Sequence, residues 1–167
     1  MSDRSISVLF DGDKEIQDVA AFHMKFDMLV SMQQPAMLVP MLAMERADCI
    51  EEELREFREA VERNDMLGMA DALIDITYFV KGTAVMMGLP WRALWDDVQG
   101  ANMRKVRGKT HRNQAVDVMK PPGWVGPQTG AILLAHGFDV RAYLDPLQGQ
   151  FDNALMATHP KDRGDVG

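Results

Sequence analysis

The chain has 167 residues, of which 47% are hydrophobic and 26% are charged, and its formal net charge is −7 at pH 7. This length and composition are typical of one folded domain with its own core, and the acidic balance argues against a nucleic-acid coat protein, which needs an excess of Lys and Arg. The single cysteine, Cys49, excludes an intramolecular disulfide.

The sequence predicts neither a signal peptide nor a membrane span. The N-terminal stretch MSDRSISVLFDGDKE lacks the apolar core of a signal peptide, and no run of roughly 18 apolar residues follows it. We therefore expect a cytoplasmic protein without a membrane or nucleic-acid partner. Residues 1–12 are expected to form an N-terminal arm.

Helical patterns fill the chain from residue 13 to residue 107. The predicted helices span residues 14–29, 43–63, 66–87 and 91–106. Gly88 ends the third helix, and Pro90 precedes the fourth at its first turn. Four helices with short connections predict an all-α fold, a four-helix bundle. Residues 108–167, rich in Gly and Pro, are expected to form an irregular C-terminal extension, in which AILLAHGF favours a short helix or strand.

The second helix carries glutamates beside its apolar stripe. Its stripe is expected to contain Ile50, Leu54, Phe57 and Val61. At 100° per residue, Glu53 lies roughly 70° from the centre of that stripe, and Glu56 follows on the same edge. Glu52 and Glu59 lie farther toward solvent. Glu53 and Glu56 are therefore expected to border the core.

The third helix is apolar nearly all round and still contains Asp71 and Asp75, one turn apart. Tyr78 and Gly82 continue that face. In a buried helix, two desolvated and mutually repelling aspartates require a cation, and the face offers no Lys or Arg. A hard divalent metal ion takes oxygen ligands, and it would also gather Glu53 and Glu56. The alternative is a solvated acidic face or an interhelical salt bridge.

Three segments carry a resemblance to a known family. EELREFREA, ADALIDITYFVKGTAVMMGLP and ANMRKV resemble the all-α nucleoside triphosphate pyrophosphatases of the MazG-like superfamily, whose hallmark is EExxE on one helix and ExxD on the next. Glu52, Glu53 and Glu56 match the first motif, and Asp75 matches the closing aspartate of the second. Ala72 replaces the glutamate of ExxD, which makes Asp71 the natural substitute ligand.

The resemblance implies that residues 13–107 form a catalytic domain that hydrolyses a nucleoside triphosphate to a monophosphate and pyrophosphate. Two or three Mg²⁺ or Mn²⁺ ions would bind the triphosphate, held by carboxylates. The implied metal ligands are Glu53, Glu56, Asp71 and Asp75. Either Glu52 or Glu53 would orient the attacking water. The implied substrate-binding residues are Asn102, Lys105, Gln33 and Tyr78.

Several alternatives stay open from the sequence. The tail NMRKVRGKTHRNQAVDVMKPPGWVGP looks like the MazG-like enzymes of phage genomes, which implies dGTP or GTP as substrate and a host-cytoplasm location. Other members of the family act on dUTP. A non-catalytic helical interaction protein is a further alternative. The apolar surface of residues 67–87 predicts a homodimer or homotetramer with the second and third helices at the interface.

Overall fold

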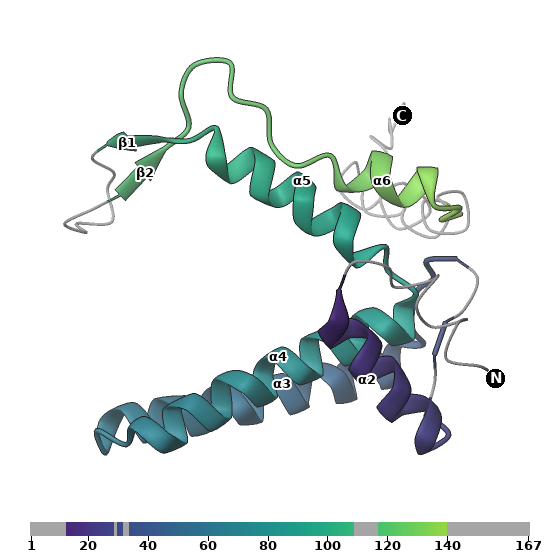
Figure 1. Ribbon diagram of the computed structural model, residues 1–167, viewed down its shortest axis with the longest axis vertical. Coiled ribbons are helices and arrows are strands. Elements are labelled where there is room, and N and C mark those ends of the chain that lie inside the picture. The colour runs from purple at the N-terminus through teal and green to yellow at the C-terminus, as the bar shows by residue number, and fades with distance from the viewer. Residues whose placement is uncertain (1–12, 29, 32–33, 109–116, 140–167) are drawn as a thin grey trace, which may run out of the picture.

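The computed structural model describes residues 13–28, 30, 31, 34–108 and 117–139 (Figure 1). Within these residues the order of elements is α2 (Lys14–Lys25), α3 (Pro40–Glu62), α4 (Met66–Met87), α5 (Trp91–Met103), β1 (Val106–Gly108), β2 (Asp117–Met119) and α6 (Thr129–Ala135). The prediction of an all-α fold is confirmed, with one small two-stranded sheet added.

The helix boundaries follow local sequence signals. Asp13 caps α2 by accepting a hydrogen bond from the Ile16 N–H at 2.9 Å. Pro40 stands at the first turn of α3, which therefore begins three residues earlier than predicted. Asp65 caps α4 by accepting from the N–H of Gly68 at 3.0 Å. Gly88 ends α4 in the left-handed region, with φ of 62°.

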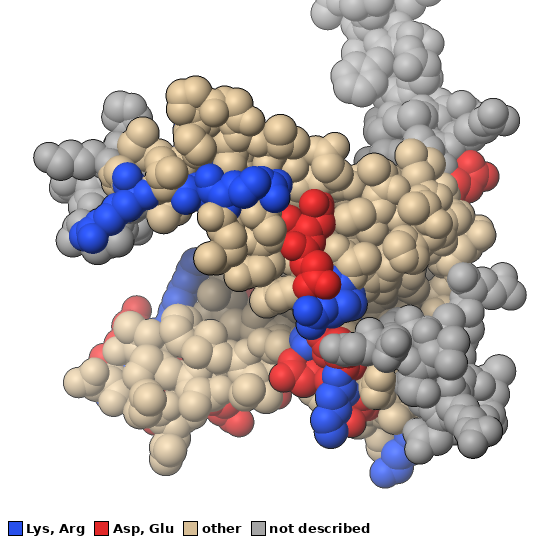
Figure 2. Space-filling model, turned by 45° about the horizontal axis from the view of Figure 1, so that its top comes forward, with Lys and Arg blue, Asp and Glu red and all other residues tan. Residues whose placement is uncertain are grey.

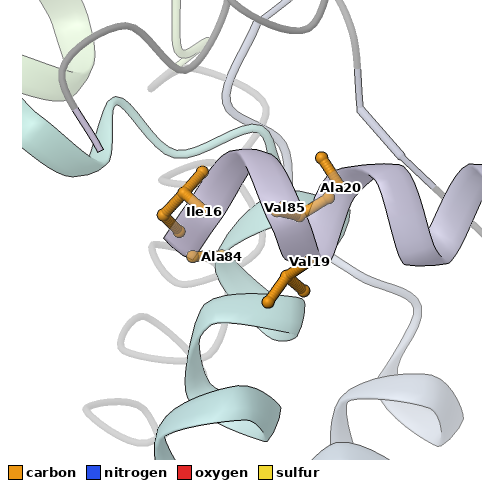
Figure 3. Close-up of a cluster of buried hydrophobic side chains, with 5 residues drawn as sticks. All are labelled: Ile16, Val19, Ala20, Ala84 and Val85. Atoms are coloured by element: carbon orange, nitrogen blue, oxygen red, sulfur yellow. The ribbon is translucent and has the colours of Figure 1, made fainter. Parts of the chain in front are cut away.

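Helices α3 and α4 form a long antiparallel hairpin, and α2 crosses the C-terminal part of α4 (Figure 1). Small and branched apolar side chains meet at that crossing, and the buried cluster contains Ile16, Val19, Ala20, Ala84 and Val85 (Figure 3). His23 is buried beside this cluster with 2% of its surface exposed. The core thus fixes α2 near the open end of the hairpin.

Helix α5 diverges from the α3–α4 hairpin instead of packing along it as a fourth bundle helix (Figure 1). It contacts α6, and it ends at β1, whose Arg107 pairs with Val118 of the antiparallel strand β2. The helix stops at Met103, three residues before the predicted end. The expected short helix or strand at AILLAHGF is α6.

None of the helices in the described ranges is long and apolar enough to cross a membrane. Helix α4 is nevertheless strongly apolar on the outside of the hairpin, where Leu67 is 83% and Ile74 is 66% exposed. This apolar surface has no partner element within the described part of a single chain.

Candidate functional site

Glu53 lies on the face of α3 that packs against α4. Arg46, Glu53 and Ala60 are seven residues apart and share one side of the helix, where Arg46 and Ala60 are buried and Glu53 is half-buried. Leu54 and Val61, expected in the buried stripe, are 39% and 49% exposed. Helix α3 is therefore rotated from the predicted phase, and Glu53 lies nearer the centre of the interface than expected.

The cause of this rotation is a close approach of small residues near the turn of the hairpin. A Cβ placed on Gly68 of α4 would lie 3.1 Å from the Cβ of Ala60 on α3. The two helices can approach this closely only because both residues are small. Once Ala60 faces α4, the seven-residue spacing turns Glu53 toward α4 as well.

Helix α4 presents one of its two aspartates to the same interface. Ala72 is 3% exposed and Asp75 is half-buried, whereas Asp71 is exposed. Leu73 and Ile74 beside them are 50% and 66% exposed. The expectation that this helix has no solvated face is therefore wrong for a single chain, and the helix buries Asp75 but not Asp71.

The carboxylates of α3 and α4 act on Glu53 electrostatically. The pKa of the Glu53 side chain is raised above its usual value of 4.5, first by burial and then by four neighbouring carboxylates. In order of decreasing effect these belong to Glu56, Asp75, Glu52 and Asp71. The four other acidic residues singled out from the sequence therefore all lie within electrostatic range of Glu53.

Basic side chains do not neutralise the centre of this acidic cluster. Within the described residues, Glu53, Glu56, Asp71 and Asp75 make no ion pair. Glu52 lies 3.8 Å from Arg55, and the Glu59 carboxylate contacts both Arg55 and Arg63. Glu59 is therefore engaged in surface ion pairs, in agreement with its predicted place outside the cluster.

The donor set of the cluster fits a hard divalent cation, because every side chain offers carboxylate oxygens and Glu53 is already destabilised by its neighbours. In the described part of the chain, no three His, Cys, Asp or Glu side chains converge closely enough to form a complete metal site. The carboxylates are therefore neighbours across the α3–α4 interface and not a closed coordination sphere.

A comparison with known protein families identifies one family. The phosphoribosyl-ATP pyrophosphohydrolase family matches residues 19–102, half of the chain, from α2 to the end of α5. The chain belongs to the phosphoribosyl-ATP pyrophosphohydrolase family. This family is part of the MazG-like all-α superfamily, so the chain has the fold of nucleotide pyrophosphohydrolases. No curated protein matches the sequence.

The segment shared with the phosphoribosyl-ATP pyrophosphohydrolase family contains the whole acidic cluster. Ala72, at the position of the superfamily's ExxD glutamate, faces α3 and is buried. Asp71 lies one residue away on the exposed side, and its effect on the pKa of Glu53 is the smallest of the four. The structure therefore brings Asp71 to the edge of the cluster, and Asp75 nearer its centre.

Of the four expected substrate-binding residues, two lie together and a third lies on another helix. Lys105 Nζ donates a hydrogen bond to Asn102 Oδ1 at 2.8 Å, so these two share the end of α5. Tyr78 packs edge-on against Phe22, with ring centroids 5.6 Å apart, and burial raises its pKa, with Asp18 adding to the shift. Gln33 lies outside the described residues.

A cavity of about 670 Å³ lies where α2, α4 and α5 meet, and it is distinct from the acidic cluster. Its α4 wall consists of Ile76, Thr77, Val80 and Lys81. At 100° per residue these side chains lie on the side of α4 away from Asp75. Asn102 and Lys105 do not line this cavity either.

Arg46 is a buried cation that was not predicted from the sequence, and it is 9% exposed. Its guanidinium donates to the Phe79 carbonyl at 3.0 Å and to Thr83 Oγ1 at 3.2 Å, and burial lowers its pKa. A Cβ on Gly82 would lie 3.0 Å from Arg46 Nη2. The seven-residue spacing of Arg46 from Glu53, opposite a glycine of α4, is the signal that could have revealed it.

Lys81 of α4 is 8% exposed and forms ion pairs with carboxylates at the start of α2. Its ammonium lies 3.1 Å from Asp13 Oδ1 and also contacts the Glu15 carboxylate. Burial favours a lower pKa for Lys81, but the hydrogen bonds that its ammonium donates to the Glu15 and Asp13 carboxylates outweigh this effect and raise the pKa. This pair holds the start of α2 on α4.

Proposed function

We propose that this chain is a divalent-metal-dependent nucleoside triphosphate pyrophosphohydrolase, which converts an NTP or dNTP to the monophosphate and pyrophosphate. The observation that carries the proposal is the environment of Glu53, half-buried between α3 and α4 among four other carboxylates. Such a cluster is unfavourable without a cation and is suited to a metal-bound polyphosphate.

Glu53, Glu56 and Asp75 are the proposed metal ligands, with Asp71 as a further ligand at the edge. Bound Mg²⁺ or Mn²⁺, two or three ions per site, would neutralise the triphosphate and the departing pyrophosphate. Ligands drawn from both α3 and α4 would keep the site on the rigid hairpin. Since Ala60 and Gly68 fix the approach of these helices, the hairpin holds the carboxylates in register.

Glu52 or Glu53 is proposed to orient the attacking water and accept its proton. The water oxygen would form a bond to the α-phosphorus while the bond from that phosphorus to the α–β bridging oxygen breaks, and pyrophosphate leaves with the bridging oxygen. Burial favours Glu53 for this role, because Glu52 is exposed and lies 3.8 Å from Arg55. Asn102 and Lys105, joined by a hydrogen bond, are proposed to bind phosphate oxygens.

We infer guanine nucleotides, dGTP or GTP, as the preferred substrates, because the C-terminal tail resembles that of the phage enzymes; dUTP is the second candidate. The test is pyrophosphate release from a panel of eight nucleoside and deoxynucleoside triphosphates with Mg²⁺. The proposal predicts release from at least one of them and highest kcat/KM for dGTP or GTP. Absence of pyrophosphate release from all eight would contradict it.

We further propose that the chain acts as a homodimer or homotetramer with α3 and α4 at the interface. Support comes from the large apolar side chains that α4 exposes on one chain, among them Met66 at 73%, Leu67 at 83% and Ile74 at 66%. Sedimentation equilibrium at micromolar concentration tests this directly. A folded monomer at that concentration would be the contrary result.

A further inference from the structure

The end of α5 and the segment KPPGW carry a group of cations without carboxylate partners. Four of these cations are Arg104, Lys105, Arg107 and Lys120, which we call the basic platform. Within the described residues none of the four makes an ion pair. Figure 2 shows Lys and Arg side chains gathered on the projecting part of the molecule at upper left. From Val98 to Phe138 the sequence contains a single acidic residue, Asp117.

Trp124 organises the basic platform. Its Nε1 donates to the carbonyl oxygen of Ala101 in α5 at 2.8 Å, which fixes the indole on the helix. Lys120 Nζ lies 4.8 Å and Lys105 Nζ lies 5.8 Å from the centroid of the indole ring. Both ammonium groups thus lie over the face of an aromatic ring, and Lys105 also donates to Asn102 Oδ1. Neither forms an ion pair with an acidic side chain in the described part of the chain.

The backbone after Trp124 is also tied to α5. Arg104 Nη2 donates to the Val125 carbonyl at 3.2 Å, and the Gln128 N–H donates to the Asp97 carboxylate. Beside these contacts lies a shallow depression of about 490 Å³, lined by Arg104, Pro121, Pro122, Gly123, Trp124 and Val125. Residues 120–128 are thus a docked part of the domain and not a loose appendage.

A set of like charges held together by an aromatic ring and backbone carbonyls is electrostatically unfavourable on its own, and a polyvalent anion relieves it. The local excess of cations contrasts with the chain's net charge of −7. Lysine ammonium and arginine guanidinium groups donate charge-assisted hydrogen bonds to phosphate oxygens. The chemistry of the platform therefore favours a phosphate-rich ligand.

We infer that the basic platform binds the polyphosphate of the nucleotide substrate, with Lys120 and Arg104 as phosphate-binding residues beside Lys105. This inference rests on the proposed function and assigns a role to the C-terminal extension. Lys120 and Trp124 lie beyond residues 19–102, so this part of the binding surface is an addition to the segment shared with the family. Lys105 and Lys120 over the indole of Trp124, with Arg104 lining the same depression as that indole, form a small group of cations. Such a group suits a short polyphosphate better than an extended nucleic acid.

The test is titration calorimetry of the full chain with inorganic tripolyphosphate, in EDTA so that metal binding does not contribute. We expect Lys120→Gln and Arg104→Gln each to weaken binding about tenfold, as for the loss of a hydrogen bond to a charged group. The matched control is Lys25→Gln, which removes one charge at the end of α2, and it should bind as the parent does.

Three results would overturn the inference. These are parent-like binding by Lys120→Gln, an equal loss in Lys25→Gln, and tighter binding of a single-stranded decanucleotide than of tripolyphosphate in a Lys120-dependent manner. Kinetics separates this inference from the proposed function. Lys120→Gln should raise KM with kcat retained. If the parent hydrolyses no nucleotide yet loses tripolyphosphate binding in Lys120→Gln, the proposed function fails and the platform stands.

Discussion

Asp75 on α4 lies close enough to Glu53 on α3 for its carboxylate to raise the pKa of the Glu53 side chain, although the two residues belong to different helices. The hairpin brings them together because its closest approach, at Ala60 and Gly68, orients both interior faces.

Glu53→Gln should abolish turnover, with a loss of about 10²-fold or more in kcat, because it removes the central carboxylate while keeping the side chain's size. Steady-state pyrophosphate release provides the measurement. Glu59→Gln is the control, since Glu59 is occupied by Arg55 and Arg63. It should retain parent activity and lose at most about 1 kcal/mol of stability. Equal damage from both changes would show that the cluster is misassigned.

We expect Glu53→Gln to change the thermal stability of the metal-free protein in a pH-dependent way. The folded-state pKa of Glu53 is raised above its usual value of 4.5, so the ionised side chain destabilises the fold at pH 7. Glu53→Gln should therefore melt at a higher temperature than the parent at pH 7 in EDTA. The difference should shrink as the pH falls through the folded-state pKa toward 4.5. Melting curves from pH 7 to pH 4 test this, and a difference that grows with acidity would contradict it.

Asp75→Asn and Asp71→Asn should differ in how much Mn²⁺ affinity they lose. Asp75 is half-buried and acts more strongly on Glu53, whereas Asp71 is exposed and acts least. We expect the larger loss of Mn²⁺ affinity at Asp75, measured by calorimetric titration. Asp71→Ala combined with Ala72→Glu should regain part of the activity lost in Asp71→Ala, since it restores the ExxD spacing. If Asp71→Asn changes neither activity nor Mn²⁺ affinity, Asp71 is not a ligand.

Gly82→Ala should destabilise the fold by about 1–3 kcal/mol, because the added Cβ would lie 3.0 Å from both Arg46 Nη2 and His23 Nε2 in a packed site. Gly100→Ala in α5 is the matched control. Its Cβ would meet only a flexible arginine at 3.4 Å, and alanine is a better helix former by up to about 1 kcal/mol. Urea unfolding should show opposite signs for the two changes. A parent-like Gly82→Ala would mean that Arg46 has room to move.

Helix type and most helix ends could be predicted from the sequence, since apolar periodicity and the capping residues Asp13, Asp65 and Gly88 are local signals. The rotation of α3 about its own axis could not be predicted, because it is fixed by the contact between Ala60 and Gly68 on different helices. The acidic residues of the site were identified by type and spacing. The seven-residue spacing of Arg46 from Glu53 indicates its side of α3, but its burial depends on Gly82 of the facing helix. The position of the Trp124 indole likewise depends on a tertiary contact, its hydrogen bond to Ala101.

The most direct test of the metal-bound carboxylate cluster is the melting temperature of the parent and of Glu53→Gln at pH 7, each with and without Mn²⁺. Binding to the native state alone raises stability by RT ln(1 + [L]/Kd), so saturating Mn²⁺ at about 100 times Kd should add about 2.7 kcal/mol to the parent. The parent's melting temperature should rise, and that of Glu53→Gln should rise far less. A parent that does not respond to Mn²⁺, or a Glu53→Gln variant that responds equally, would contradict the account.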